Sequence, residues 1–90
     1  MKMQPETQKK PVQVPSVGRV VHYIAFGTPG GEFPAGVRRA AIITEVDDPG
    51  NPESSVGLCV LNPTGQFFNR NVPKRSTPGG WEWPEYVPAK

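Results

Sequence analysis

The sequence has few of the side chains that most catalytic and metal sites use. Among its 90 residues, Cys59 is the only cysteine and His22 the only histidine. A single thiol cannot form an intramolecular disulfide, which excludes a disulfide-stabilised secreted scaffold. One cysteine and one histidine cannot supply the three or four ligands of a zinc site. The sequence also lacks a long apolar run, at its N-terminus or elsewhere, so we expect a cytoplasmic protein without a membrane span.

No pattern of residues predicts a catalytic or cofactor site. Cys59 lies in the apolar run 57–61, where we expect a buried structural thiol rather than a nucleophile activated by His22. The carboxylates of segment 47–55 surround turn-forming residues and are expected to be solvated. The glycine-rich segment 27–31 lacks the Lys-Ser/Thr pair and the helix of a phosphate-binding loop. We therefore predict a protein that is not an enzyme, with no catalytic residues, no metal and no cofactor.

Charge and helix-forming segments are also scarce. Residues 1–16 hold three lysines and one glutamate, whereas residues 17–90 hold seven basic and seven acidic side chains, so the net charge of +2 belongs to the first segment. Dedicated duplex-binding domains usually carry a basic excess on the domain itself, and the case for nucleic acid is weak. With 12 prolines and 10 glycines, the longest stretch free of both is 37–48, which is rich in β-branched residues and predicts a strand.

With helix-forming segments scarce, the apolar patterning of the sequence predicts short strands. Alternating or continuous apolar residues predict them at 17–26, 37–46, 56–61 and 66–71, with a last short strand at the Trp81-Glu82-Trp83 segment. We expect segment 27–36 to be a surface loop. In strand 37–46, alternation places Ala40, Ile42 and Val46 on one face and Ala41 and Ile43 on the other.

Turn residues connect these strands. Asp48-Pro49-Gly50 is typical of a β-turn, in which proline sets φ and glycine supplies the left-handed conformation. Asn62-Pro63-Thr64-Gly65 predicts an antiparallel hairpin between strands 56–61 and 66–71, with Gly65 in the left-handed position of a G1 bulge. Leu58, Val60 and one of the neighbours Phe67 and Phe68 are expected in the core.

The fold class that follows is all-β. Five short strands in about seventy residues predict a small five-stranded SH3-like or OB-like barrel. We expect residues 1–16 to be a disordered or extended arm, residues 17–86 to be the barrel domain, and residues 87–90 to be a tail.

Three strings of the sequence form a pattern of motifs, namely GRVVHYIAFGTPGGEFPAGVRRAAIITEV (18–46), GLCVLNPTGQFFNRNVP (57–73) and GGWEWPE (79–85). They resemble a family of small actinobacterial and phage proteins without an established activity. Their order and spacing match the family pattern over about residues 18–85, which implies a phage or prophage setting in a bacterial host. The chain departs from the pattern at Arg38, where many members have cysteine, and at Glu82, where many have histidine. These departures argue against a catalytic role shared by the family.

Aromatic and arginine side chains are the best candidates for a binding site. Phe67 and Phe68 are adjacent on a strand and must face opposite sides, while Trp81 and Trp83 share a side, so some rings are expected to be partly exposed. An exposed ring beside a guanidinium can stack on a flat ligand while the guanidinium pairs with phosphate or carboxylate. The candidate ligand-binding residues are Tyr23, Arg38, Arg39, Asn62, Thr64, Phe68, Asn69, Arg70, Trp81 and Trp83, with structural packing alone as the alternative.

Three functions remain open at this point. The first is a non-catalytic binding protein of phage type that sequesters a small anionic, nucleotide-derived ligand by aromatic stacking and arginine. The second is a protein-interaction or self-assembly module, with a homo-oligomer as one form. The third is a nucleic-acid-binding barrel, in which the Lys9-Lys10 arm would add phosphate contacts.

Overall fold

The computed structural model describes residues 12–27 and 35–85, and in these ranges the chain forms five β-strands and no helix, hence none that could cross a membrane. The all-β prediction is confirmed, and the strands lie within a few residues of their predicted positions. Most of the predicted loop 27–36 and most of the predicted arm lie outside the described residues. The strands are β1 (Val20–Ile24), β2 (Arg38–Val46), β3 (Val56–Asn62), β4 (Gly65–Val72) and β5 (Trp81–Glu82).

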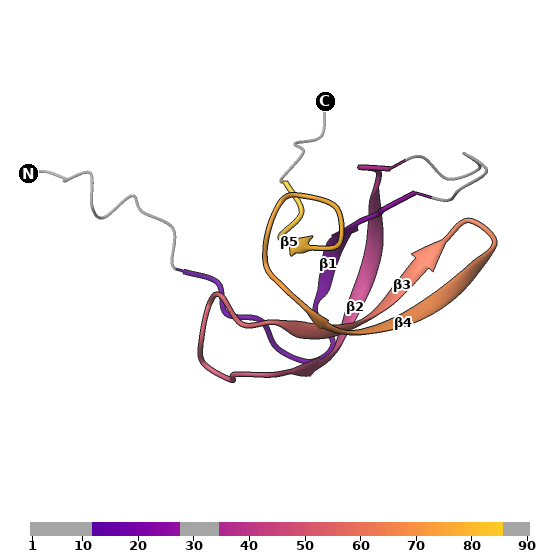
Figure 1. Cartoon of the computed structure of the whole chain (residues 1–90). Helices are drawn as coiled ribbons and strands as arrows, with labels where there is room; N and C mark the ends of the chain where they lie inside the picture. Colours follow the sequence, from indigo (N-terminus) through magenta and orange to yellow (C-terminus); the bar gives the residue numbers. More distant parts are fainter. Residues whose placement is uncertain (1–11, 28–34, 86–90) are drawn as a thin grey trace, which may run out of the picture.

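The five strands form one antiparallel sheet in the order β4-β3-β2-β1-β5. Figure 1 shows this sheet strongly bent, with the β3–β4 hairpin extending to one side and β5 beside β1. Among the described residues, β4 and β5 are the edges of the sheet. After β4 the chain turns back, and a single parallel bridge joins Lys74 to Trp81.

Two β-bulges decide which side chains face the core. In β2 the register shifts by one residue between Ile43 and Glu45, which brings Val46 opposite Val56. Val46 therefore packs against the same core as Ala41. The prediction that Val46 shares a face with Ala40 and Ile42 is wrong, because an extra residue in a bulge reverses the alternation beyond it.

The second bulge lies in β4. Val56 pairs with Val72 and Leu58 with Asn69, so β4 holds one more residue than β3 over this stretch. Within it Asn71 has a φ of 56°, a left-handed conformation that asparagine tolerates better than most residues. The bulge turns Val72 into the core, where it is buried.

The β3–β4 hairpin is confirmed, but its turn is tighter than predicted. Asn62 pairs directly with Gly65, so only Pro63 and Thr64 form the loop. Gly65 has no positive φ, and the predicted G1 bulge with a left-handed Gly65 is wrong. Gly65 is paired in the ladder and is not a loop residue, and neither Pro63 nor Thr64 has a positive φ. The predicted turn at Asp48-Pro49-Gly50 does have its glycine at a φ of 89°.

The core fills one face of the sheet. Its buried members are Val21, Ala41, Ile43, Val56, Leu58, Val60, Val72 and Trp81, with Tyr23, Val46 and Trp83 packed against them. Leu58 and Val60 are in the core as predicted. Phe67 and Phe68 are 55% and 69% exposed, so the prediction that one of them is a core residue is wrong. Their opposite orientations are confirmed by the register, which pairs Phe67 with core residue Val60 and Phe68 with Cys59.

Trp81 anchors two loops to this core. Its side chain is fully buried, and its indole Nε1 donates a hydrogen bond to the Ser54 carbonyl at 3.2 Å. Ser54 is itself buried, and its hydroxyl accepts a hydrogen bond from the Asp48 amide at 2.8 Å. The backbone amide of Trp81 donates to the Pro73 carbonyl at 2.9 Å. One residue of β5 thus fixes segments 47–55 and 73–80.

Residues before β1 also contact the domain. Pro15 is buried, and the Arg19 guanidinium donates a hydrogen bond to the Gln13 side chain at 3.0 Å. The described end of the predicted arm therefore packs on the sheet, while residues 1–11 lie outside the described ranges.

We expect Trp81→Phe to lower the free energy of unfolding by about 1–3 kcal/mol, because the buried Ser54 carbonyl loses its donor. Trp81→Ala should cost more, about 3–5 kcal/mol, because it also leaves a cavity. Urea denaturation measures both. Trp83→Phe is the matched control: it removes no hydrogen bond within the described part of the chain and should cost less than Trp81→Phe. Equal losses for the two Phe variants would contradict the anchoring role of Trp81.

The left-handed Asn71 gives a second prediction for stability. Asn71→Gly should leave stability unchanged or raise it, whereas Asn71→Val should lower it by about 1–2 kcal/mol, because a β-branched residue is strained at positive φ. Gln66→Val in the same strand lacks this strain and serves as the control in urea denaturation. If Asn71→Val proved as stable as Asn71→Gly, the bulge would not be conformationally constrained.

Candidate functional site

One end of the core face is left open by the described residues and forms a pocket of about 230 Å³. Trp81 is buried in the same face beside Tyr23 but is not among the residues that line the pocket. Because β5 is only two residues long, it does not extend over the β3–β4 hairpin. The pocket is lined by Tyr23, Ala25, Phe26, Gly27, Arg39, Val60, Asn62, Phe67 and Asn69.

Strand register brings the pocket side chains together. Tyr23 of β1 pairs with Arg39 of β2, and Val60 of β3 pairs with Phe67 of β4. Asn69 lies two residues beyond Phe67, on the same face of β4. These positions share the face of the sheet that carries the core, so the pocket is a continuation of the core that lacks a covering element.

The pocket has the chemistry of a site for a flat anion. Tyr23, Phe26 and Phe67 supply aromatic rings, and Arg39 is the only charged side chain among the described lining residues. Asn62 adds an amide that can donate or accept. Burial raises the pKa of Tyr23 above its ordinary value, so its hydroxyl stays protonated at neutral pH and can donate a hydrogen bond.

Phe26 is held at the rim by the turn before β5. The Gly79 amide donates to the Ile24 carbonyl at 2.8 Å, which places the turn beside the end of β1. Gly79 has a φ of 89°, and the Phe26 ring lies so close that a Cβ atom at Gly79 would collide with it. Glycine is therefore required here both for its conformation and for its small size.

Four of the ten predicted site residues line this pocket, namely Tyr23, Arg39, Asn62 and Asn69. Sequence reasoning missed Phe67 in favour of its neighbour Phe68. Pairing with the core residue Val60 identifies Phe67 once the hairpin register is known. Phe26 carries no such signal, because its position depends on the turn at Gly79.

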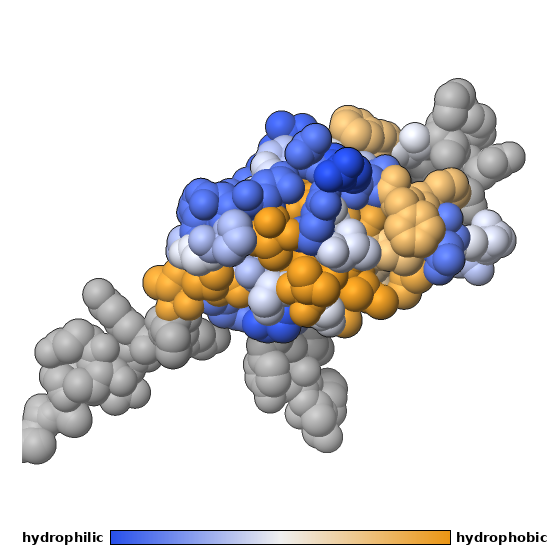
Figure 2. All heavy atoms as spheres, turned by 90° about the horizontal axis from the view of Figure 1, so that it is seen from below, coloured by the Kyte–Doolittle hydropathy of each residue, from blue (hydrophilic) through white to orange (hydrophobic). Residues whose placement is uncertain are grey.

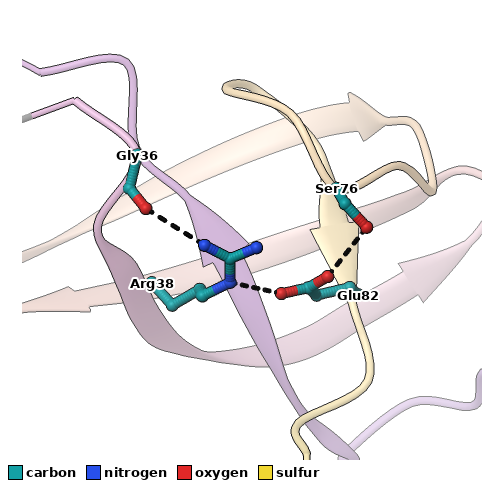
Figure 3. A network of polar contacts seen from close by, with 4 residues as sticks. All are labelled: Gly36, Arg38, Ser76 and Glu82. Atoms are coloured by element: carbon teal, nitrogen blue, oxygen red, sulfur yellow. Dashed lines mark hydrogen bonds and ion pairs between the residues drawn. The ribbon is translucent and has the colours of Figure 1, made fainter.

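Arg38 is on the opposite face of the sheet. Figure 3 shows its guanidinium donating to the Glu82 carboxylate and to the Gly36 carbonyl, with the Ser76 hydroxyl donating to the other Glu82 oxygen at 2.9 Å. Arg38 and Glu82 belong to β2 and β5, so this ion pair crosses over β1. The hydrogen bonds that the Glu82 carboxylate accepts from Arg38 and Ser76 hold its pKa below the ordinary value.

Arg70 is engaged in a second ion pair on that opposite face. Its guanidinium donates two hydrogen bonds to Glu45, at 2.8 and 3.2 Å. The Glu45 side chain reaches Arg70 by lying across Gly57 of β3, where a Cβ atom would approach the Glu45 Cγ to 2.7 Å. The bonds from Arg70 lower the pKa of Glu45.

The other predicted site residues are also outside the pocket. Trp81 is a core residue, and Trp83 packs edge-on against it with ring centroids 5.3 Å apart, while the Arg19 guanidinium lies 4.7 Å from the Trp83 ring. Thr64 is exposed in the hairpin turn, and Phe68 is on the face opposite the pocket.

Cys59 is half-buried on the face opposite the core, with its Sγ 3.8 Å from the Gln66 side-chain oxygen. The prediction of a buried thiol is wrong, because alternation in β3 points Leu58 and Val60 inward and Cys59 outward. In ranges 12–27 and 35–85, no cluster of histidine, cysteine and carboxylates is arranged to hold a metal ion.

Comparisons with protein-family models, with curated proteins and with solved structures found no match.

The Arg38–Glu82 pair predicts a pH effect on stability. Because the folded protein lowers the pKa of Glu82, the pair stabilises the fold above the ordinary value of 4.5, and this contribution is lost as pH falls through the lower folded value. The difference in unfolding free energy between the wild type and Glu82→Gln should therefore shrink as the pH is lowered. Arg38→Gln should show the same trend. A difference independent of pH would contradict the ion pair.

Proposed function

We propose that this protein is a non-catalytic binding protein that holds a small anionic ring compound, such as a nucleotide-derived molecule, in the pocket of Phe67 and Arg39. The observation that carries the proposal is the placement of Arg39 among three aromatic rings in one pocket. The rings stack on the flat part of the ligand, and the guanidinium pairs with its phosphate or carboxylate.

The volume of the pocket limits the size of the ligand. Its volume of about 230 Å³ is below the ~300–1,000 Å³ of common small-molecule sites. A single ring system with one anionic group suits this volume better than two linked nucleotides. Among nucleotide-derived molecules, the proposal therefore favours a mononucleotide or its base-containing fragment.

The fold and setting proposed here are an SH3-like barrel and a phage protein acting in the cytoplasm of a bacterial host. The Lys74–Trp81 bridge supports the barrel, since it brings the segment after β4 beside β5. The three family-like strings support the setting. In that setting a binding protein that catalyses no reaction acts by sequestering its ligand.

A thermal-shift screen with mononucleotides, cyclic mononucleotides and cyclic dinucleotides tests the proposal. A ligand that binds only the folded protein raises its melting temperature, and the stabilisation grows with the logarithm of one plus the ratio of ligand concentration to Kd. We expect a mononucleotide to raise the melting temperature more than a cyclic dinucleotide does. Phe67→Ala should weaken its binding about tenfold or more, because stacking on one ring contributes ~1–3 kcal/mol. Arg39→Gln should weaken binding of the nucleotide more than binding of the corresponding nucleoside, because only the nucleotide carries a phosphate that pairs with the guanidinium.

Adjacent residues provide the matched controls. Phe68→Ala and Arg38→Gln change the same residue types on the opposite face of the sheet, and the ligand-induced shift should survive in both. The proposal fails if no compound of the panel raises the melting temperature, or if Phe68→Ala abolishes the shift as Phe67→Ala does.

A further inference from the structure

The face of the sheet opposite the core carries a row of apolar side chains. Val20 pairs with Ile42, Ile42 with Cys59, and Cys59 with Phe68, so the row crosses four strands without a charged residue. Val20, Ile42 and Phe68 are 55%, 38% and 69% exposed. We call these four residues, with the neighbouring exposed Leu61, the outer apolar row.

No described segment covers this row. Seen from below the view of Figure 1, apolar side chains gather in the middle of the molecule between groups of polar ones (Figure 2). A contiguous exposed apolar surface on a small domain typically marks an interaction site. Sheets bury such faces against a second sheet, about 10 Å away, in β-sandwiches.

Charges lie at the ends of the outer face and are already paired. The Arg70–Glu45 pair spans β3 over Gly57, and the Arg38–Glu82 pair spans β1. A partner therefore meets apolar side chains in the middle and one cation with one anion at each end. A partner with a large net charge of one sign would find no excess of the opposite charge on this face.

We propose that the outer face is the interface between two copies of this chain, packed face to face about a two-fold axis that runs along β3. Such an axis exchanges the β4 side with the β2 side. It places Phe68 of one copy over Ile42 of the other, since these residues flank Cys59 on its two sides. A two-fold interface requires this kind of self-complementary surface.

Charge complementarity favours a second copy over another partner. Arg70 and Glu45 come from strands on either side of β3, so the same axis brings Arg70 of each copy toward Glu45 of the other. The Arg70 side chain is 78% exposed and can bridge the two copies. Residues 17–90 carry equal numbers of basic and acidic side chains, so two copies do not repel each other through net charge.

The size of the row sets how the dimer behaves. Four strands at a spacing of about 4.8 Å give a row roughly 14 Å wide. The area of a row this narrow is below the ~800 Å² per partner of a standard interface. We therefore expect a dimer that dissociates on dilution, and its mass must be followed over a concentration series.

Sedimentation equilibrium of the full chain is the primary experiment. The wild-type mass should rise from 9.8 kDa toward twice that value as concentration increases. Phe68→Asp should remain monomeric at every concentration, whereas Phe67→Asp, on the opposite face, should still dimerise. A wild type that stays at 9.8 kDa, or a Phe68→Asp variant that dimerises like the wild type, overturns the proposal.

A charge swap tests the axis. Arg70→Glu should weaken association because it places two carboxylates together across the interface, and the double variant Glu45→Arg/Arg70→Glu should restore it. Both residues are surface-exposed, so neither variant should prevent folding. Failure of the double variant to recover, with the single variant impaired, would overturn the β3 axis.

Cys59 gives an independent geometric readout, because it is the only cysteine and lies in the middle of the row. Face-to-face packing encloses this side chain between the two sheets, so its reaction with iodoacetamide, in which the thiolate displaces iodide, should slow as the wild-type concentration is raised. Phe68→Asp should show no such protection. Equal alkylation rates at low and high wild-type concentration overturn the proposal, whatever the outcome of the ligand screen.

Discussion

The burial of Trp81 is the constraint on which the rest of the structure depends. One face of the sheet carries the core, and a domain of this size has few large side chains with which to cover it. The Trp81 ring is fully buried in that core, while its Nε1 and backbone amide donate hydrogen bonds to the Ser54 and Pro73 carbonyls. The loops that carry few apolar residues of their own are thereby attached to the core. Without this residue, the sheet would lack both its cover and its links to two loops.

The same constraint leaves the candidate pocket open. A two-residue β5 places Trp81 in the core but not among the residues that line the pocket. Phe67 remains 55% exposed beside this core. The candidate site thus lies where the described residues leave the core face uncovered.

Alternation along β4 separates the candidate pocket from the outer apolar row. Phe67 faces the pocket and Phe68 the outer apolar row, although they are neighbours in sequence. The ion pairs of Arg38 and Arg70 belong to the outer face, and Arg39 belongs to the pocket. The proposed ligand binding and the proposed self-association can therefore be tested independently, since they involve opposite faces of the same strands.

Local propensity and two-residue periodicity sufficed to predict the strands, the hairpin at Pro63, the all-β class and the opposite orientations of Phe67 and Phe68. Residue type singled out Tyr23 and Arg39. Which face each strand presents followed only from the folded structure. The bulges between Ile43 and Glu45 and at Asn71 reverse the alternation without a distinct sequence signal. Register across the bent sheet, rather than composition, determined that Phe67 lines the pocket while Arg38 and Arg70 pair with carboxylates elsewhere.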